Sequence, residues 1–98
     1  MMINQSLVAK AKTALRVSSN MYDEQIDELI SAAKIDLQIA GVVLPAELDA
    51  LCNIAIVTYV CLHFGQPEDY DRLKRSYDEQ KAQLQTATGY TEWSGSDV

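Results

Sequence analysis

The sequence contains few of the residues that interrupt helices or carry out chemistry. Its 98 residues include four glycines, two prolines, two cysteines and a single histidine. Four scattered glycines cannot form a glycine-rich phosphate loop, and so few turn residues disfavour a fold of many short strands. The length fits one domain. We therefore expect an all-α protein: a small bundle of about four helices with a central apolar helix, a projecting C-terminal helix and a flexible tail.

Positive charge is scarce as well. Eight Lys and Arg residues stand against 14 Asp and Glu, which gives a net charge of −6 and a pI of about 4.5. Such a chain lacks the basic surface with which proteins bind phosphate groups. This balance does not exclude a protein that surrounds DNA without holding it. The composition, 48% hydrophobic and 22% charged, is typical of a globular protein.

The cysteines and the histidine give no sign of catalysis. Cys52 and Cys61 lie nine residues apart in one predicted helix and point to opposite sides, so they cannot form a disulfide. We interpret them as small buried apolar residues in a reducing compartment. His63 points about 200° away from Cys61 around the helix, so the two cannot form a catalytic pair. We expect no enzymatic activity and no cofactor.

Carboxylate pairs occur at the start of the second predicted helix, where Asp23 stands four residues before Asp27 and Glu24 four before Glu28. The segment lacks the loop of a calcium site, and no group of residues has the spacing of a zinc site. Acidic residues also suit the first turns of a helix electrostatically. We expect a solvated acidic face and no bound metal.

The most informative segment is 48–64, which is apolar on every side when drawn as a helix. A surface helix normally has one apolar stripe, so this helix must be surrounded. A chain of this size has few elements for the purpose, and other copies of the chain could supply some of the cover. The segment is slightly short of the ~20 apolar residues of a membrane span and contains polar residues. Because the N-terminal segment lacks a secretory signal pattern, we expect a soluble, intracellular protein that does not bind membranes.

Helices are predicted at about 5–16, 22–40, 46–64 and 68–86. Gly41 and Gly65 would end the second and third helices, and Pro45 and Pro67 would stand in the first turns of the third and fourth. We assign residues 1–87 to the helical domain and residues 88–98 to a C-terminal tail.

The second predicted helix has apolar residues on two sides. Its core face is a narrow arc made of Ile26, Leu29, Ile30, Ala33, Leu37 and Ala40. Ile35 and Ile39 lie on the opposite side, one turn apart. Either the first helix or the loop at 42–44 covers them, or they contact another subunit.

The fourth predicted helix has one narrow apolar stripe and is charged elsewhere. The stripe consists of Tyr70, Leu73, Tyr77 and Leu84, with Gln80 in the remaining place. This heptad-like spacing indicates contact along one edge. In the tail, Tyr90 and Trp93 either fold back on the domain or dock to a partner.

The first predicted helix is basic. Its cations are Lys10, Lys12 and Arg16. They would meet phosphates, an acidic neighbour, or the acidic start of the second helix at 23–28. We favour the last, because it needs no external partner.

Several segments together resemble the head–tail connector proteins of tailed bacteriophages and prophages, also called head-completion or DNA-packaging adaptor proteins. They are LVAKAKTALRV at 7–17, DEQIDELISAAKIDLQIAG at 23–41, ALCNIAIVTYVCLHFG at 50–65 and SYDEQKAQLQTATGYTEW at 76–93. Each segment is degenerate, and their order and spacing carry the resemblance.

The resemblance implies a structural role in the virion, with assembly in the cytoplasm of the bacterial host. Proteins of this family form a homo-oligomeric ring on the portal protein, extend the DNA channel and receive the next head-completion (stopper) protein or the tail. Double-stranded DNA passes through without sequence-specific binding. The family has no catalytic residues to carry over to this chain.

Two groups of apolar residues are the candidate contacts in such an assembly. The oligomer interface would use Ile35, Ile39, Tyr70, Leu73 and Tyr77. Docking to the portal or to a neighbouring subunit would use Leu84, Tyr90 and Trp93. The alternative is a small helical DNA-binding or regulatory protein, with the fourth helix as its recognition element.

Overall fold

The computed structural model describes residues 5–45, 48–65 and 67–86, and these ranges are helical throughout their regular parts, as predicted, without a β-strand. The elements are α1 (Gln5–Leu15), a short 3₁₀ turn at Asn20–Tyr22, α2 (Asp23–Ile39), α3 (Ala50–His63) and α4 (Tyr70–Thr86). All four predicted helices are therefore present. None extends beyond its predicted range, and each is shorter than predicted at one end or at both.

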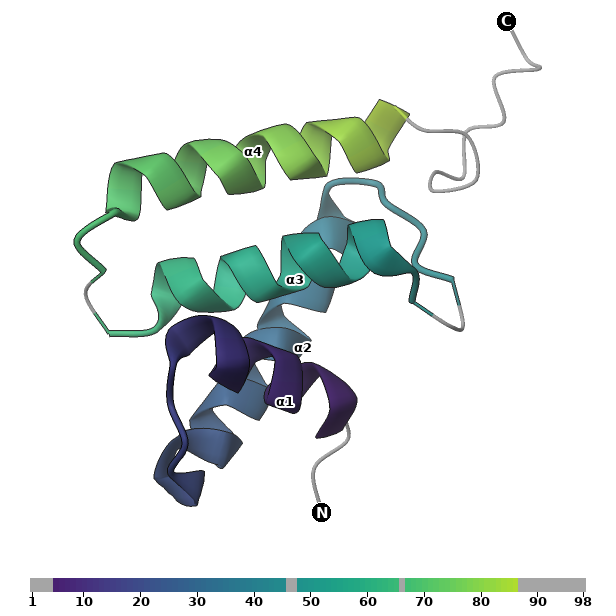
Figure 1. Cartoon of the computed structure of the whole chain (residues 1–98). Helices are drawn as coiled ribbons and strands as arrows, with labels where there is room; N and C mark the ends of the chain where they lie inside the picture. The colour runs from purple at the N-terminus through teal and green to yellow at the C-terminus, as the bar shows by residue number, and fades with distance from the viewer. Residues whose placement is uncertain (1–4, 46–47, 66, 87–98) are drawn as a thin grey trace, which may run out of the picture.

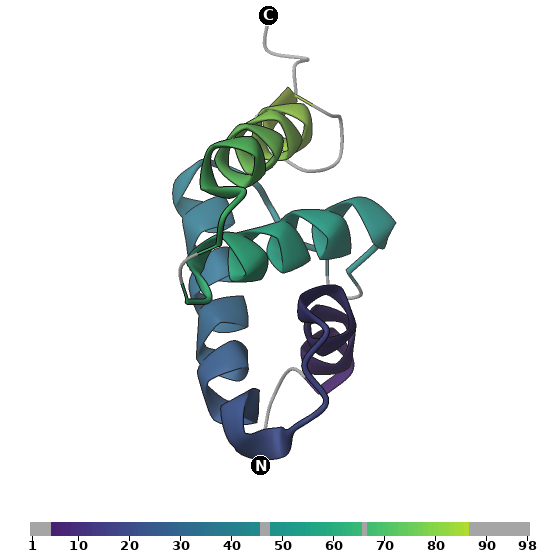
Figure 2. The same ribbon diagram turned by 60° about the vertical axis from the view of Figure 1, so that its left-hand side comes forward.

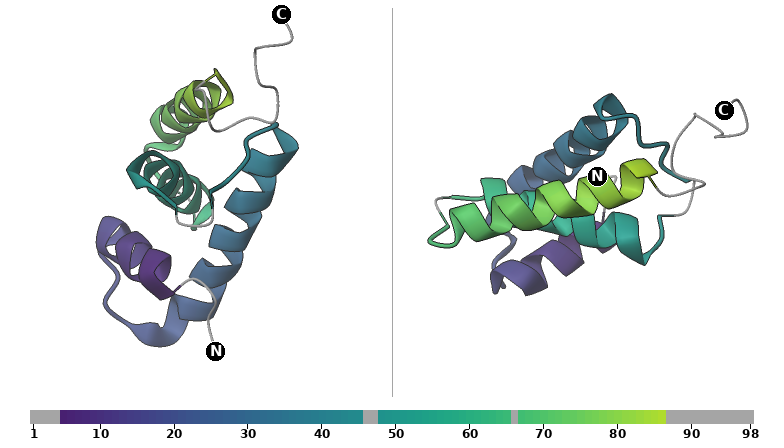
Figure 3. Two further views of the ribbon diagram at one scale, coloured as in Figure 1. Left: turned by 90° about the vertical axis from the view of Figure 1, so that its right-hand side faces the viewer. Right: turned by 90° about the horizontal axis from the view of Figure 1, so that it is seen from above.

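The helices form two layers. α3 lies in the middle of one layer, with α1 on one side and α4 on the other (Figure 1, Figure 2). α2 crosses behind these three helices and forms the second layer, as Figure 3 shows when the stack is seen from its side. α3 and α4 run in opposite directions along each other. Because α3 contacts each of the other three helices, it is the central helix that the sequence predicts.

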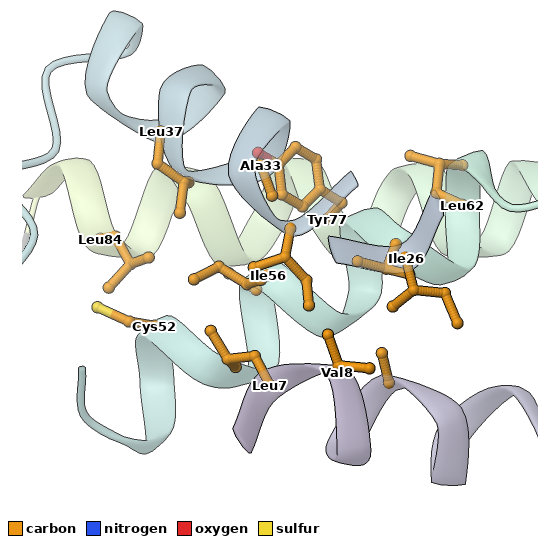
Figure 4. Packing of buried hydrophobic residues seen from close by; sticks show 14 of the residues in the cluster. Leu7, Val8, Ile26, Ala33, Leu37, Cys52, Ile56, Leu62, Tyr77 and Leu84 are labelled. Carbon is orange, nitrogen blue, oxygen red and sulfur yellow. The ribbon is translucent and has the colours of Figure 1, made fainter. Parts of the chain in front are cut away.

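The core fills the space between the two layers (Figure 4). All four helices and Val42, in the loop after α2, supply its buried residues: Leu7, Val8 and Ala11 of α1, Ile26, Ile30, Ala33 and Leu37 of α2, Cys52, Ala55, Ile56, Val60 and Leu62 of α3, and Tyr77 and Leu84 of α4. The predicted core arc of α2 is thus confirmed at its four buried positions. Packing of these apolar faces supplies most of the stability of such short helices.

The two prolines do not stand in the first turns of the helices that follow them, so these predictions are wrong. α3 begins at Ala50 because the side chain of Asp49 accepts a hydrogen bond from the backbone N–H of Cys52 at 3.1 Å. Such a cap satisfies an N–H that has no partner within the helix. α4 begins after Asp69, whose carbonyl accepts the first helical bond from the N–H of Leu73 at 2.8 Å.

Glycine and arginine residues with positive φ follow the ends of the first three helices. Gly41 follows α2 with φ +94° and Gly65 follows α3 with φ +66°, as expected for glycines at helix C-termini. Arg16 follows α1 with φ +60°, a conformation that costs a residue with a Cβ about 1 kcal/mol or more. The end of α1 is therefore strained where glycine would relieve it.

Replacement of Arg16 by glycine should raise the free energy of unfolding by about 0.5 to 1 kcal/mol, because glycine adopts positive φ without strain. Urea denaturation monitored by circular dichroism measures the change. Ala9→Gly is the matched control: Ala9 is an exposed residue inside the same helix, and its replacement should lower the stability by about 1 kcal/mol. A loss of stability in Arg16→Gly would contradict the strain.

Candidate interaction surfaces

The outer side of α2 is an exposed apolar surface. Ile35 is 55% exposed and Ile39 is 80% exposed. α1 packs against α3 and against the core side of α2, so the alternative in which α1 or the loop at 42–44 covers the two isoleucines is wrong. Both isoleucines therefore stay exposed on the described part of their own subunit.

A second apolar surface lies on the outer side of α3. Leu51 is 42% exposed and Ile54 is 52% exposed. Beside them is a shallow hollow of about 380 Å³ between α1 and α3, lined by Lys10, Ala50, Asn53, Ile54, Val57 and Thr58. The sequence predicts that α3 must be surrounded, yet among residues 5–45, 48–65 and 67–86 nothing fully covers this side of the helix. Sequence reasoning missed Leu51 and Ile54 because a helix that is apolar all round gives no sign of which side stays bare.

The two surfaces face away from each other. Ile54 stands two residues before the buried Ile56, so their side chains point about 200° apart around α3. Ile35 likewise stands two residues before the buried Leu37 on α2 and points about 200° away from it around the helix. Since the buried sides of α2 and α3 meet in the core, the two exposed surfaces lie on opposite sides of the two-layer molecule (Figure 3).

Polar contacts join α4 to α2, two of them to one carboxylate and one to a backbone carbonyl. The hydroxyl of Tyr77 donates a hydrogen bond to Oδ2 of Asp36, and Nζ of Lys81 lies 3.3 Å from the same oxygen. Nε2 of Gln85 donates to the carbonyl of Ala40 at 2.9 Å. Burial, and then the hydrogen bond to Asp36, raise the pKa of Tyr77 well above its usual value. Sequence reasoning missed Asp36, which has no distinctive spacing.

The position of α4 corrects part of the predicted interface. Tyr77 is 4% exposed and Leu84 is 1% exposed, so both belong to the core of their own subunit and cannot contact another chain in this fold. Leu73 is partly buried against the same core. Tyr70 is 45% exposed and stays available for contact. Tyr90 and Trp93 lie outside the described residues.

The basic residues in α1 and directly after it divide into two kinds. Lys12 forms an ion pair with Asp23 at 2.8 Å and donates a hydrogen bond to Asn20 at 2.9 Å, which confirms for Lys12 the predicted contact with the start of α2. Lys10 and Arg16 are exposed. Lys10 lines the hollow beside Ile54.

The residues with reactive side chains lie apart from one another. Cys52 is buried and Cys61 is half-buried, and both are free thiols. The His63 ring packs on the Tyr59 ring, with 4.2 Å between centroids. In residues 5–45, 48–65 and 67–86, no three His, Cys, Asp or Glu side chains are placed so that they could hold a metal ion.

None of the helices in the described part of the chain has the length and hydropathy that crossing a membrane requires.

Alkaline pH should destabilise the protein. Burial, with the carboxylate of Asp49 nearby, raises the pKa of the Cys52 thiol from 9.0 to about 11. The folded state then keeps a proton that the unfolded state loses, so stability that is full below pH 9 is lost as the pH rises toward 11. The loss should reach roughly 2 to 3 kcal/mol from this thiol, and Tyr77 adds to it above pH 10.

Urea denaturation at a series of pH values from 8 to 11 measures this effect. The matched control is Cys52→Ala, in which the fall in stability between pH 9 and pH 10 should be smaller; burial also raises the pKa of the Cys61 thiol, which accounts for part of the remainder. Equal slopes in the two proteins would show that the Cys52 thiol is not responsible.

Comparison of the chain with protein-family models, with curated proteins and with solved structures gave no match in any of the three.

Proposed function

We propose that the protein is a structural subunit of the head–tail connector of a tailed bacteriophage or prophage. In this role it forms a homo-oligomeric ring on the portal protein, continues the DNA channel and receives the stopper or tail protein. The observation that carries the proposal is the isoleucine pair on the outer side of α2, because Ile35 and Ile39 are exposed by the fold of their own subunit. A subunit that works by assembly needs such a surface.

The energetics of this surface favour association. A fully buried isoleucine side chain contributes roughly 1.5 to 3 kcal/mol compared with an exposed one. The two residues stand one turn apart on a rigid helix, so their burial against a partner would cost little ordering of the backbone. Isolated exposed apolar residues are common on monomers, whereas an adjacent pair on one helix face is a better contact surface.

The charge of the chain supports the role of a conduit for DNA. The net charge is −6, and the most basic helix, α1, has one of its cations bound to Asp23. A ring with few free cations would attract the phosphate backbone weakly, so DNA could slide through it. The order and spacing of the sequence segments that resemble connector proteins agree with this proposal.

The decisive test is the native mass of the purified protein over a wide concentration range, together with negative-stain imaging. Closed rings are the expected result. A protein that remains monomeric up to millimolar concentration would contradict the proposal. A compact dimer that binds duplex DNA, with an affinity that falls steeply with salt, would instead indicate the DNA-binding alternative.

Ring formation should be lost in Ile35→Asp while the fold is kept, because the variant places a charge on the contact surface. The matched control is Gln38→Asp, which introduces the same charge at another exposed position of α2. Circular dichroism checks the fold of both variants. Rings that persist in Ile35→Asp would show that this surface is not a subunit contact.

A further inference from the structure

We propose that the outer surface of α2 in one copy of the chain binds the hollow between α1 and α3 in the next copy, so that subunits associate head to tail. This inference rests on the proposed ring and assigns the two faces from which it is built. The donor face consists of Ile35 and Ile39, and the acceptor face is the hollow beside Leu51 and Ile54.

The positions of the two faces favour head-to-tail association over pairing of like faces. They lie on opposite sides of the molecule, so a copy that uses one face still offers the other. Contact between two unlike faces repeats from copy to copy and gives a closed ring or a filament. Pairing of α2 with α2 would instead stop at a dimer and leave the second apolar surface bare.

Charge complementarity identifies a second copy as the occupant. Glu24 and Glu28 are exposed on the same side of α2 as the isoleucines, since Glu28 precedes Ile35 by two helical turns. The acceptor face is mostly apolar, with Asn53 and Thr58 as its neutral polar residues, and its one charged lining residue is the cation Lys10. In the proposed contact, a stripe that is acidic at one end and apolar at the other meets a hollow that is basic on α1 and mostly apolar on α3.

The spacing of Glu28 and Ile35 on α2 also matches the distance between the axes of α1 and α3. Glu28 and Ile35 are seven residues apart, which is about 10 Å along the axis of α2. The axes of packed helices such as α1 and α3 lie about 8 to 10 Å apart. An α2 helix laid across the pair would place Ile35 and Ile39 against Ile54 and Glu28 near Lys10 of α1.

The test uses two variants of the full chain that each block one face. Ile39→Lys blocks the donor face and Ile54→Lys blocks the acceptor face; both residues are at least half exposed, so the fold should be retained. Each variant alone should be monomeric. An equimolar mixture should form a species of twice the monomer mass and nothing larger, because the intact donor face of one variant binds the intact acceptor face of the other. Lysine at both positions keeps the two altered faces mutually repulsive.

Sedimentation velocity and native mass spectrometry give the masses, and circular dichroism reports the fold. Self-association of Ile54→Lys alone would overturn the inference in favour of α2–α2 pairing, and a mixture that stays monomeric would overturn it as well. Rings that form in the wild type and in both variants would also overturn it, yet leave the proposed function standing. A wild type that never assembles would contradict the ring and the face pairing together.

Charge reversal provides a second, independent measurement. Glu28→Lys should weaken association roughly threefold to fivefold, as for an exposed ion pair. Glu28→Lys combined with Lys10→Glu in the same chain should restore it, because each contact joins residue 28 of one copy to residue 10 of the next. Failure of the double variant to recover association would contradict the pairing of these two residues. The control Glu79→Lys changes an exposed charge on α4 and should leave association unchanged.

Discussion

Ile56→Ala should lower the free energy of unfolding by about 3 to 4 kcal/mol, the typical cost of a truncated core isoleucine. Ile56 is fully buried and lies among residues of the other three helices (Figure 4). Its replacement removes apolar contacts and leaves a cavity that rigid neighbouring helices cannot fill. The loss is a large fraction of the total stability of a small domain, so the variant should be close to unfolding at 37 °C.

The matched control is Ile54→Ala, the same substitution two residues earlier. Ile54 is 52% exposed, so its truncation should cost less than about 1 kcal/mol. Both variants are compared by urea denaturation at a protein concentration low enough that the wild type is monomeric. Equal losses in the two variants would mean that α3 does not have the buried and exposed sides described above.

Asp36→Ala should lower the free energy of unfolding by about 2 kcal/mol. The variant leaves the buried hydroxyl of Tyr77 without its acceptor and removes the partner of Lys81. A hydrogen bond from a buried donor to a carboxylate contributes more than a neutral one, and its loss leaves the donor desolvated and unpaired. The packing of α4 against α2 should therefore loosen, and amide hydrogens should exchange faster in α4 than in α3.

Asp78→Ala serves as the control for Asp36→Ala. Asp78 pairs with Lys74 at 3.0 Å on the exposed side of α4, and removal of such a pair should cost less than about 0.5 kcal/mol. A double-mutant cycle between Asp36→Ala and Tyr77→Phe should give a coupling of about 1 kcal/mol or more. Additive effects in this cycle would mean that the hydroxyl and the carboxylate do not stabilise each other.

Much of the helical framework follows from local sequence. The scarcity of Gly and Pro predicts helices, and the periodicity of apolar residues predicts the core arc of α2. Backbone preference predicts the glycines that follow α2 and α3. The helix starts are harder to predict: the prolines at 45 and 67 suggest earlier starts than those set by the capping residue Asp49 and by Asp69. A proline only permits a helix to begin, whereas a capping side chain satisfies N–H groups at a particular residue.

The contacts between helices depended on the tertiary structure. Periodicity identified the stripe of α4 and the outer isoleucines of α2, but an apolar stripe has the same spacing whether it faces its own subunit or another chain. The fold decided this by burying Tyr77 and Leu84 in the core and leaving Ile35 and Ile39 bare. The role of Asp36 likewise required α4, whose Tyr77 lies 41 residues further along the chain. Sequence therefore determined which residues share a face, because that depends on helix geometry alone, and tertiary packing determined which faces are covered, because that depends on elements far apart in the chain.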